Sequence, residues 1–214
     1  MEQLAINGGT PSKTKPFPKW PHSDNNERVL IDQVLSSGNW WRMTGDKLVT
    51  FEEKFAKAHS VDYCLGVTNG TRAIELALTA LGIKRGDEVI VPAVTFISTA
   101  SAVLYVNATP VLVDVDPVTF CMMPEAFERA ITPKTRAVIP VHMAGHACDM
   151  EQICSIAKKY GIAVIEDAAH GHGGQCNHKM IGSYGDMSIF SFQNGKIMTC
   201  GEGGAVITRH KHVY

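Results

Sequence analysis

From Tyr63 onward, short apolar runs alternate with segments of helical spacing, and this alternation restricts the chain to a small set of folds. The runs are Cys64–Val67, Glu88–Val91, Val111–Val115, Ala137–Val141, Ala163–Glu166, Met187–Phe192 and Ala205–Thr208. Nearly continuous apolar strands joined by helical crossovers are typical of a sheet that is covered on both faces. The sequence therefore predicts a three-layer α/β fold, with a mostly parallel seven-stranded sheet flanked by helices.

The predicted helices have start and stop signals of their own. Asp149 can cap one helix that ends at Gly161, and Pro124 suits the first turn of another. The apolar positions of Arg72–Leu81 share one helical face, and Gly82 can end that helix. Two earlier helices are predicted, from Asp24 to Gly38 and around Leu48–Ala58.

The first 22 residues are rich in Gly, Pro and Lys, and they favour an extended arm. We therefore predict an arm over residues 1–22 and one large domain over residues 23–214.

Composition excludes several classes of partner. The chain has 214 residues, a net charge of −1 and no block of like charges, which argues against nucleic acid and anionic membranes as partners. No run reaches the length of a membrane span, and the N-terminus has no apolar signal region. The six cysteines are scattered without CxxC pairs, as in a reduced, cytoplasmic protein. We expect a cytoplasmic protein with small-molecule ligands.

In a sheet of this kind, ligands bind beyond the carboxyl ends of the strands, so the residues that follow each strand matter most. Gly70 and Thr71 follow the first strand and open a helix, whose N-terminus can hold a phosphate. The alternative is a helix that Asn69 or Thr71 caps, with no ligand bound. Phe96 follows the second strand, where it could be a core residue or a surface on which a planar ring stacks.

Two polar side chains follow the fifth strand. Asp167 stands at a buried strand end, where an unpaired charge is costly, and a protonated ring nitrogen would be a suitable partner. His170 could donate to a ring oxygen or satisfy a hydrogen bond in the core.

Ser191 and Lys196 follow the sixth strand and precede a GEGG turn. Ser191 is a second candidate for contact with a phosphate. A lysine amine is a good nucleophile only when burial or a cationic neighbour lowers its pKa, whereas most lysines are solvated surface charges. Lys196 is placed to form a Schiff base with an aldehyde.

Together these residues offer a phosphate site, a stacking ring, an acid for a pyridine nitrogen and a lysine for an aldehyde. Those are the groups that a protein must supply to pyridoxal 5'-phosphate. Asp167 would keep the pyridine protonated, and Lys196, once displaced, would move a proton as a general base. A metal site is not expected, because His142, His146, His170 and His172 lack matching Cys or carboxylate spacing.

Four stretches carry a resemblance to a known family: GDEVIVPAVTFISTA, ITPKTRAVIPVHMAG, IEDAAHGHGG and FSFQNGK with GEGG. They resemble the DegT/DnrJ/StrS aminotransferases, which are pyridoxal-phosphate enzymes of fold type I, from about Ala5 to Thr208. The resemblance implies that Lys196 is the Schiff-base lysine, that Asp167 pairs with the pyridine nitrogen and that His170 lies near the ring hydroxyl. It also implies that Phe96 stacks on the ring and that Gly70, Thr71 and Ser191 hold the phosphate.

The same resemblance suggests a reaction. Family members move an amino group from glutamate or glutamine to a keto sugar or keto cyclitol, and they form homodimers. SGNWWRMTGDK, VHMAGHACDM and FSFQNGKIMT are similar to the branch that contains glutamine:scyllo-inosose aminotransferases and 3-amino-5-hydroxybenzoate synthases. Amino transfer to a cyclic keto substrate is the first hypothesis. A dehydrating, aromatising synthase and a catalytically incomplete partner subunit are the alternatives.

One difference from the family concerns length. Its members continue into a smaller C-terminal domain, whereas this sequence stops at Tyr214, just past the seventh strand. The resemblance therefore implies the large domain without the small one.

Overall fold

The computed structural model describes residues 3–214, which fall into one unit that ends at Gly38 and a second that runs from Asn39 to Tyr214. The first unit contains a 3-10 turn, η1 (Ala5–Asn7), and helix α1 (Asn25–Ser37). The Asp24 side chain accepts a hydrogen bond from the Asn26 amide at the start of α1, and Gly38 ends the helix in a left-handed conformation. The predicted helix from Asp24 to Gly38 is confirmed, and the domain boundary after residue 22 stays a prediction.

A seven-stranded sheet organises the second unit, as predicted. Its strands, in spatial order, are β1 (Tyr63–Val67), β9 (Gly204–Thr208), β8 (Met187–Ser191), β5 (Ala163–Asp167), β4 (Thr135–Val138), β2 (Glu88–Pro92) and β3 (Thr109–Val113). The pairs from β8 to β3 are parallel, whereas β9 is antiparallel to both β1 and β8. Six strands therefore run one way and β9 runs against them.

Two strands lie earlier in the chain than predicted. β3 and β4 begin at Thr109 and Thr135, because both of these residues pair with Glu88, the first residue of β2. Val115 and Val141, the predicted ends of those strands, form isolated bridges beyond the regular ladder. The apolar runs thus continue past the last regular sheet hydrogen bonds.

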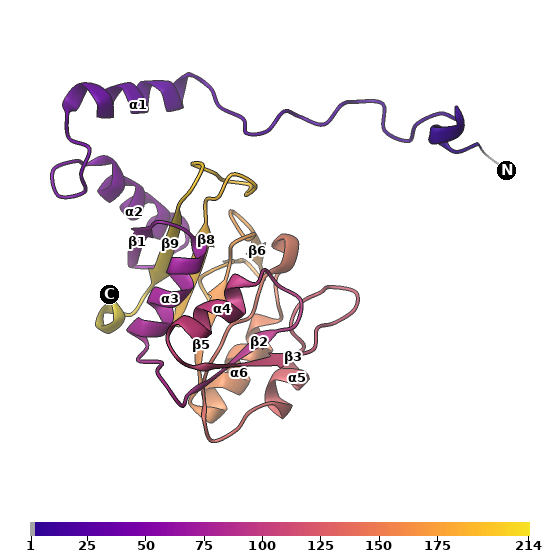
Figure 1. Cartoon of the computed structure of the whole chain (residues 1–214), viewed down its shortest axis with the longest axis vertical. Coiled ribbons are helices and arrows are strands. Elements are labelled where there is room, and N and C mark those ends of the chain that lie inside the picture. The colour runs from indigo at the N-terminus through magenta and orange to yellow at the C-terminus, as the bar shows by residue number, and fades with distance from the viewer. Residues whose placement is uncertain (1–2) are drawn as a thin grey trace. The chain divides into compact units, whose positions relative to one another are not determined.

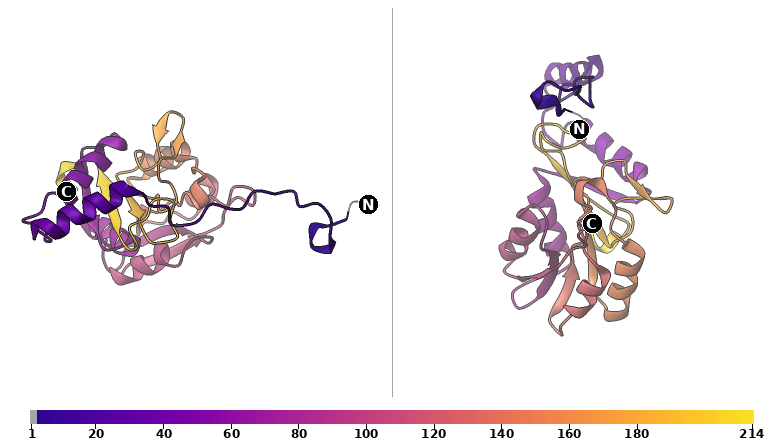
Figure 2. Two further views of the ribbon diagram at one scale, coloured as in Figure 1. Left: turned by 90° about the horizontal axis from the view of Figure 1, so that it is seen from above. Right: turned by 90° about the vertical axis from the view of Figure 1, so that its right-hand side faces the viewer.

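Helices cover both faces of the sheet, with α3 and α4 on one side and α5 and α6 on the other (Figures 1 and 2). The helices of the second unit are α2 (Lys47–Ala58), α3 (Gly70–Ala80), α4 (Ser98–Tyr105), α5 (Pro124–Arg129) and α6 (Met150–Tyr160). Successive residues of β2 pack on opposite faces of the sheet. Val89 and Val91 pack with α3 and α4, and Ile90 packs with α5 and α6. This alternation confirms the predicted three-layer arrangement.

Smaller elements complete the unit. They are the turns η2 (Met143–Gly145) and η3 (Lys211–Val213) and a hairpin of β6 (Gln175–Cys176) and β7 (Lys179–Met180). Among the described residues, no helix combines the length and apolar character needed to cross a membrane.

The direction of β9 determines what lies at the carboxyl edge of the sheet. Because β9 runs against its neighbours, its first residue, Gly204, pairs with Val67 and Ser191, the last residues of β1 and β8. A Cβ atom on Gly204 would lie 2.6 Å from the Asn69 carbonyl, so only glycine allows this close approach. The β1–α3 turn and the loop between β8 and β9 are thereby held together at one edge.

Candidate functional site

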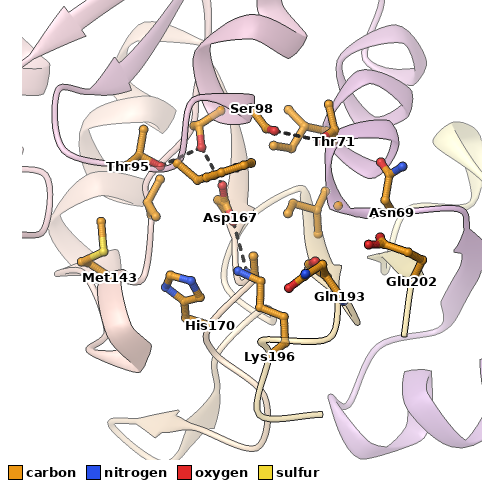
Figure 3. Close-up of a pocket in the computed structure, with 18 residues that line it drawn as sticks. Asn69, Thr71, Thr95, Ser98, Met143, Asp167, His170, Gln193, Lys196 and Glu202 are labelled. Carbon is orange, nitrogen blue, oxygen red and sulfur yellow. Dashed lines mark hydrogen bonds between the residues drawn. The ribbon is translucent and has the colours of Figure 1, made fainter. Parts of the chain in front are cut away.

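A cavity of about 410 Å³ opens at this carboxyl edge, and every predicted site residue lines it (Figure 3). Those residues are Gly70, Thr71, Phe96, Asp167, His170, Ser191 and Lys196. They come from four separate stretches of the chain, which the parallel strands bring to the same edge. The cavity is also lined by Asn69, Ile74, Thr95, Ser98, Thr99, Val141, Met143, Ala169, Ile189, Gln193 and Glu202.

The N-terminus of α3 forms one corner of the cavity. A Cβ atom on Gly70 would lie 2.9 Å from the Ser191 Cβ, so glycine is needed where β8 closes on the helix. Thr71 Oγ1 lies 2.7 Å from Ser98 Oγ. Asn69 caps the helix by accepting a hydrogen bond from the Arg72 amide at 2.9 Å, as one reading of the sequence allowed. This corner presents hydroxyl groups at the positive end of a helix dipole, which is a suitable environment for an anion.

Asp167 ends β5 at the floor of the cavity, where it is only 5 % exposed. Its Oδ2 accepts a hydrogen bond from Thr99 Oγ1 at 2.8 Å, and its Oδ1 accepts one from the Ala169 amide at 3.2 Å. Hydrogen bonds therefore hold both oxygens of the carboxylate.

Among the described residues that line the cavity, Lys196 is the only lysine or arginine. It lies in the loop between β8 and β9, and its side chain points toward the Asp167 carboxylate (Figure 3). Burial lowers the pKa of Lys196, and the charge of Asp167 opposes part of that shift. A partly buried amine with a lowered pKa is closer to the nucleophilic form than a surface lysine is.

Phe96 is 70 % exposed although it is a large apolar residue, so it is not part of the core. It lies at the cavity, in the loop between β2 and α4. An exposed aromatic ring at a cavity rim can cover one face of a planar ligand.

The hydrogen bonds of His170 indicate its tautomer. The Ala144 amide donates to His170 Nδ1 at 3.2 Å, so the proton of the neutral ring lies on Nε2. Burial and the charge of Lys196 lower the pKa of His170, whereas Asp167 opposes them. The neutral ring can thus donate one hydrogen bond, from Nε2.

Several lining residues had no clear signal in the sequence. Thr95, Ser98 and Thr99 come from α4 and the turn before it, an element that the sequence did not predict. Gln193 and Glu202 lie before and after Lys196 in the same loop. They lie in the stretches FSFQNGK and GEGG, within a few residues of Lys196, and that closeness could have suggested a place in the site.

A second polar group lies buried behind the cavity. The Glu166 carboxylate accepts hydrogen bonds from His142 Nε2 at 3.0 Å and Ser188 Oγ at 3.1 Å. It also accepts bonds from the amides of Gly182, Tyr184 and Gly185 at 2.7–2.9 Å. The Cys148 amide donates to His142 Nδ1, which leaves Nε2 to donate to Glu166. In the described part of the chain, no three His, Cys, Asp or Glu side chains are grouped as a metal ion would require.

Comparison with known proteins gives a consistent result. Residues 21–214 match the model of the DegT/DnrJ/EryC1/StrS aminotransferase family. The L-glutamine:2-deoxy-scyllo-inosose aminotransferase of Streptoalloteichus tenebrarius is 41 % identical over 210 residues, which are 96 % of this chain and 50 % of the relative.

Solved structures of the same kind superpose well. The crystal structure of 3-amino-5-hydroxybenzoic acid synthase has a TM-score of 0.90 and 46 % identity, over 93 % of this chain and 52 % of that one. The PLP-form of the sugar aminotransferase Spr1654 from Streptococcus pneumoniae has a TM-score of 0.84 and 32 % identity, over 91 % of this chain and 53 % of that one. The chain thus spans about half the length of the relatives that it matches.

Proposed function

This chain belongs to the DegT/DnrJ/EryC1/StrS aminotransferase family, and on that premise we propose that its second unit binds pyridoxal 5'-phosphate. The observation that carries the proposal is the cavity in which Asp167 and Lys196 face each other (Figure 3). The acid suits a pyridine nitrogen, and the amine suits the aldehyde across the ring. Gly70, Thr71 and Ser191 are the candidates to hold the phosphate, and Phe96 is the candidate to stack on the ring.

The other polar residues have roles that follow from their chemistry. Bound pyridoxal phosphate supplies an electron sink for the electrons released when a bond at the substrate's amino-bearing carbon breaks. His170 Nε2 can donate a hydrogen bond to the hydroxyl oxygen of the ring. The Lys196 amine would hold the aldehyde carbon of the cofactor and, when free, would carry a proton on Nζ as a general base, which its lowered pKa favours.

The proposed reaction moves an amino group from glutamine or glutamate to a keto cyclitol or keto sugar. Support comes from the relative that is named a glutamine-dependent aminotransferase of 2-deoxy-scyllo-inosose. We further propose that the protein acts in the cytoplasm and forms a homodimer. Analytical ultracentrifugation would test the dimer by measuring the mass of the particle in solution.

A spectroscopic titration tests cofactor binding and the first half of this reaction together. Purified protein is mixed with pyridoxal phosphate, and absorbance is recorded before and after addition of glutamine or glutamate. We expect a visible band on binding and its loss when the amino donor is added. Binding without any response to either donor would support the catalytically incomplete subunit instead.

A trapping experiment tests Lys196 itself. Borohydride reduction of the cofactor-loaded protein should label the peptide that contains Lys196, as mass spectrometry would show. The Lys196→Ala variant should lose the label, whereas Lys84→Ala, at a residue that does not line the cavity, should keep it. Labelling of a different lysine in the wild-type protein would refute the assignment.

A second candidate function is the aromatising dehydration of an aminohydroxybenzoate synthase. It is favoured by the 46 % identity to the 3-amino-5-hydroxybenzoic acid synthase, against 41 % for the aminotransferase relative. Ultraviolet absorbance of an aromatic product, formed without an amino donor, would identify this reaction. Product formation that depends strictly on glutamine or glutamate would identify amino transfer.

A further inference from the structure

The first turn of α4 and the turn before it carry a chain of hydroxyl groups that ends at Asp167 (Figure 3). Thr95 Oγ1 lies 2.8 Å from Thr99 Oγ1, and Thr99 Oγ1 lies 2.8 Å from Asp167 Oδ2. Thr99 is fully buried, so no solvent competes for its hydroxyl. Thr95 and Thr99 lie in the stretch GDEVIVPAVTFISTA, but neither was predicted as a site residue.

The direction of these hydrogen bonds follows from the proton count. An ionised carboxylate can only accept, so the Thr99 hydroxyl must donate to Asp167. A hydroxyl has a single proton, so Thr99 can only accept from its other neighbour, and Thr95 must be the donor. Hydrogen bonds that run in one direction polarise and strengthen one another.

The two oxygens of Asp167 are fixed by different elements. The Ala169 amide holds Oδ1 from the chain that follows β5, and Thr99 holds Oδ2 from α4. With a donor on each oxygen, rotation of the carboxylate would break at least one hydrogen bond. The plane of the carboxylate is therefore fixed before any ligand arrives.

We propose that Thr99 is a positioning residue, which aims the Asp167 carboxylate at the pyridine nitrogen of the cofactor while Thr95 holds the Thr99 hydroxyl in its donating orientation. This inference rests on the proposed function. The same turn carries Phe96 next to Thr95, and Ser98, whose hydroxyl lies 2.7 Å from that of Thr71. One short segment, residues 95–99, thus links the acid, the stacking ring and the phosphate corner.

The test compares Thr99→Val, which replaces the hydroxyl by a methyl group of similar size, with Thr99→Ser, which keeps it. We expect Thr99→Val to bind pyridoxal phosphate about tenfold more weakly, as loss of one hydrogen bond to a charged group implies. A poorly aimed carboxylate also stabilises the protonated ring less, so the absorbance of the bound cofactor should titrate at lower pH. Thr99→Ser should restore both properties to within about twofold, and Thr95→Val should show a smaller change of the same sign.

Thr208→Val is the matched control. Thr208 is also buried, and its hydroxyl donates to the Asp186 carbonyl at 2.7 Å, but it ends β9 at the opposite edge of the sheet. We expect Thr99→Val and Thr208→Val to lower the melting temperature similarly, and only Thr99→Val to move the titration of the cofactor. If both variants leave the titration unchanged, Thr99 is merely structural and the proposal is wrong.

A structural readout separates this proposal from the proposed function. If the wild-type protein binds no pyridoxal phosphate, the proposed function fails, but crystal structures of the cofactor-free wild type and Thr99→Val still decide the role of Thr99. The carboxylate of Asp167 should rotate in the variant. An unchanged carboxylate plane would overturn the inference.

Discussion

Lys196 differs from other lysines of the chain in its surroundings. Burial lowers its pKa, whereas at Lys159 a hydrogen bond to Glu128 on the surface raises the pKa. The same side chain is thus prepared for nucleophilic chemistry in one place and for ion pairing in the other. The sequence could suggest this difference only through the strand that precedes Lys196.

The pKa of Lys196 provides a test at the level of this single residue. The Asp167 charge raises that pKa against the effect of burial, so Asp167→Asn should lower it further. The pH dependence of reductive methylation of Lys196, followed by mass spectrometry in the cofactor-free protein, should shift to lower pH. Asp62→Asn, at an exposed site away from the cavity, should not shift it. A shift to higher pH in Asp167→Asn would contradict the described electrostatics.

The hydrogen bonds of Glu166 lead to a prediction about the free energy of unfolding. Its buried carboxylate accepts bonds from five donors, and Glu166→Gln would place an amide N–H group among them. Leaving buried donors unpaired should cost about 3 kcal/mol of the free energy of unfolding. Chemical denaturation would measure this loss, and Glu53→Gln, at an exposed position, should change little. An unchanged free energy of unfolding in Glu166→Gln would mean that these hydrogen bonds to Glu166 are not formed in solution.

The same residue should make stability depend on pH. Burial alone would raise the pKa of Glu166, but the hydrogen bonds from His142 and the backbone amides outweigh it, and the pKa is lowered. A group whose pKa is lower in the folded chain stabilises the fold above its unfolded pKa of about 4.3 and loses that contribution as the pH falls through the folded value. Denaturation curves below pH 5 should therefore fall more steeply for the wild type than for Glu166→Gln. Parallel curves would contradict this assignment.

At the scale of elements, the strand β9 and its first residue decide the shape of the cavity. Gly204→Ala would press a Cβ atom against the Asn69 carbonyl and the Gly70 amide, both part of the α3 corner. We expect a loss of about 3 kcal/mol in the free energy of unfolding, together with weaker binding of pyridoxal phosphate. Denaturation and an absorbance titration would measure the two effects.

Gly82→Ala is the control for this variant. Gly82 has room for a Cβ atom but a φ of +75°, so alanine there tests backbone strain without crowding. It should cost about 1 kcal/mol and leave cofactor affinity unchanged. Equal effects of the two variants on cofactor binding would show that the close approach at Gly204 does not shape the site.

The helices and strands that were predicted from the sequence are those with strong local patterns. The seven strands and the helices with clear caps, such as the one that Asp149 starts, have apolar periodicity and stop signals that are readable locally. Helix α4 was missed because its sequence, STASAVLY, has no charged face to contrast with a buried one. The short hairpin of β6 and β7 was missed because two-residue strands carry no periodicity.

The same limit applies to the site. Residues that follow a strand, such as Asp167 and Lys196, were predictable because strand ends meet at one edge. Thr99 was not, because its contact with Asp167 spans 68 positions and depends on a helix with no sequence signal.

At the scale of the whole molecule, the two units can be separated experimentally. In the part of the chain that the structure describes, no residue of the first unit is buried, and the residues that line the cavity belong to the second unit. A chain of residues 39–214 should therefore fold with a melting temperature close to that of the full chain and bind pyridoxal phosphate within about twofold of its affinity. Calorimetry and an absorbance titration would check both. Failure to fold would show that the first 38 residues contribute to the core.

The position of β9 determines when, during synthesis on the ribosome, the sheet can be completed. β1 emerges first among the strands, yet the strand that it pairs with, β9, is the last of the seven to be made. Until then β1 lacks the strand that it pairs with, and the Asn69 carbonyl lacks its close neighbour Gly204. The growing chain would therefore complete this cavity only once β9 is made, so a nascent chain that has not reached residue 204 has no finished site in which to capture a reactive aldehyde.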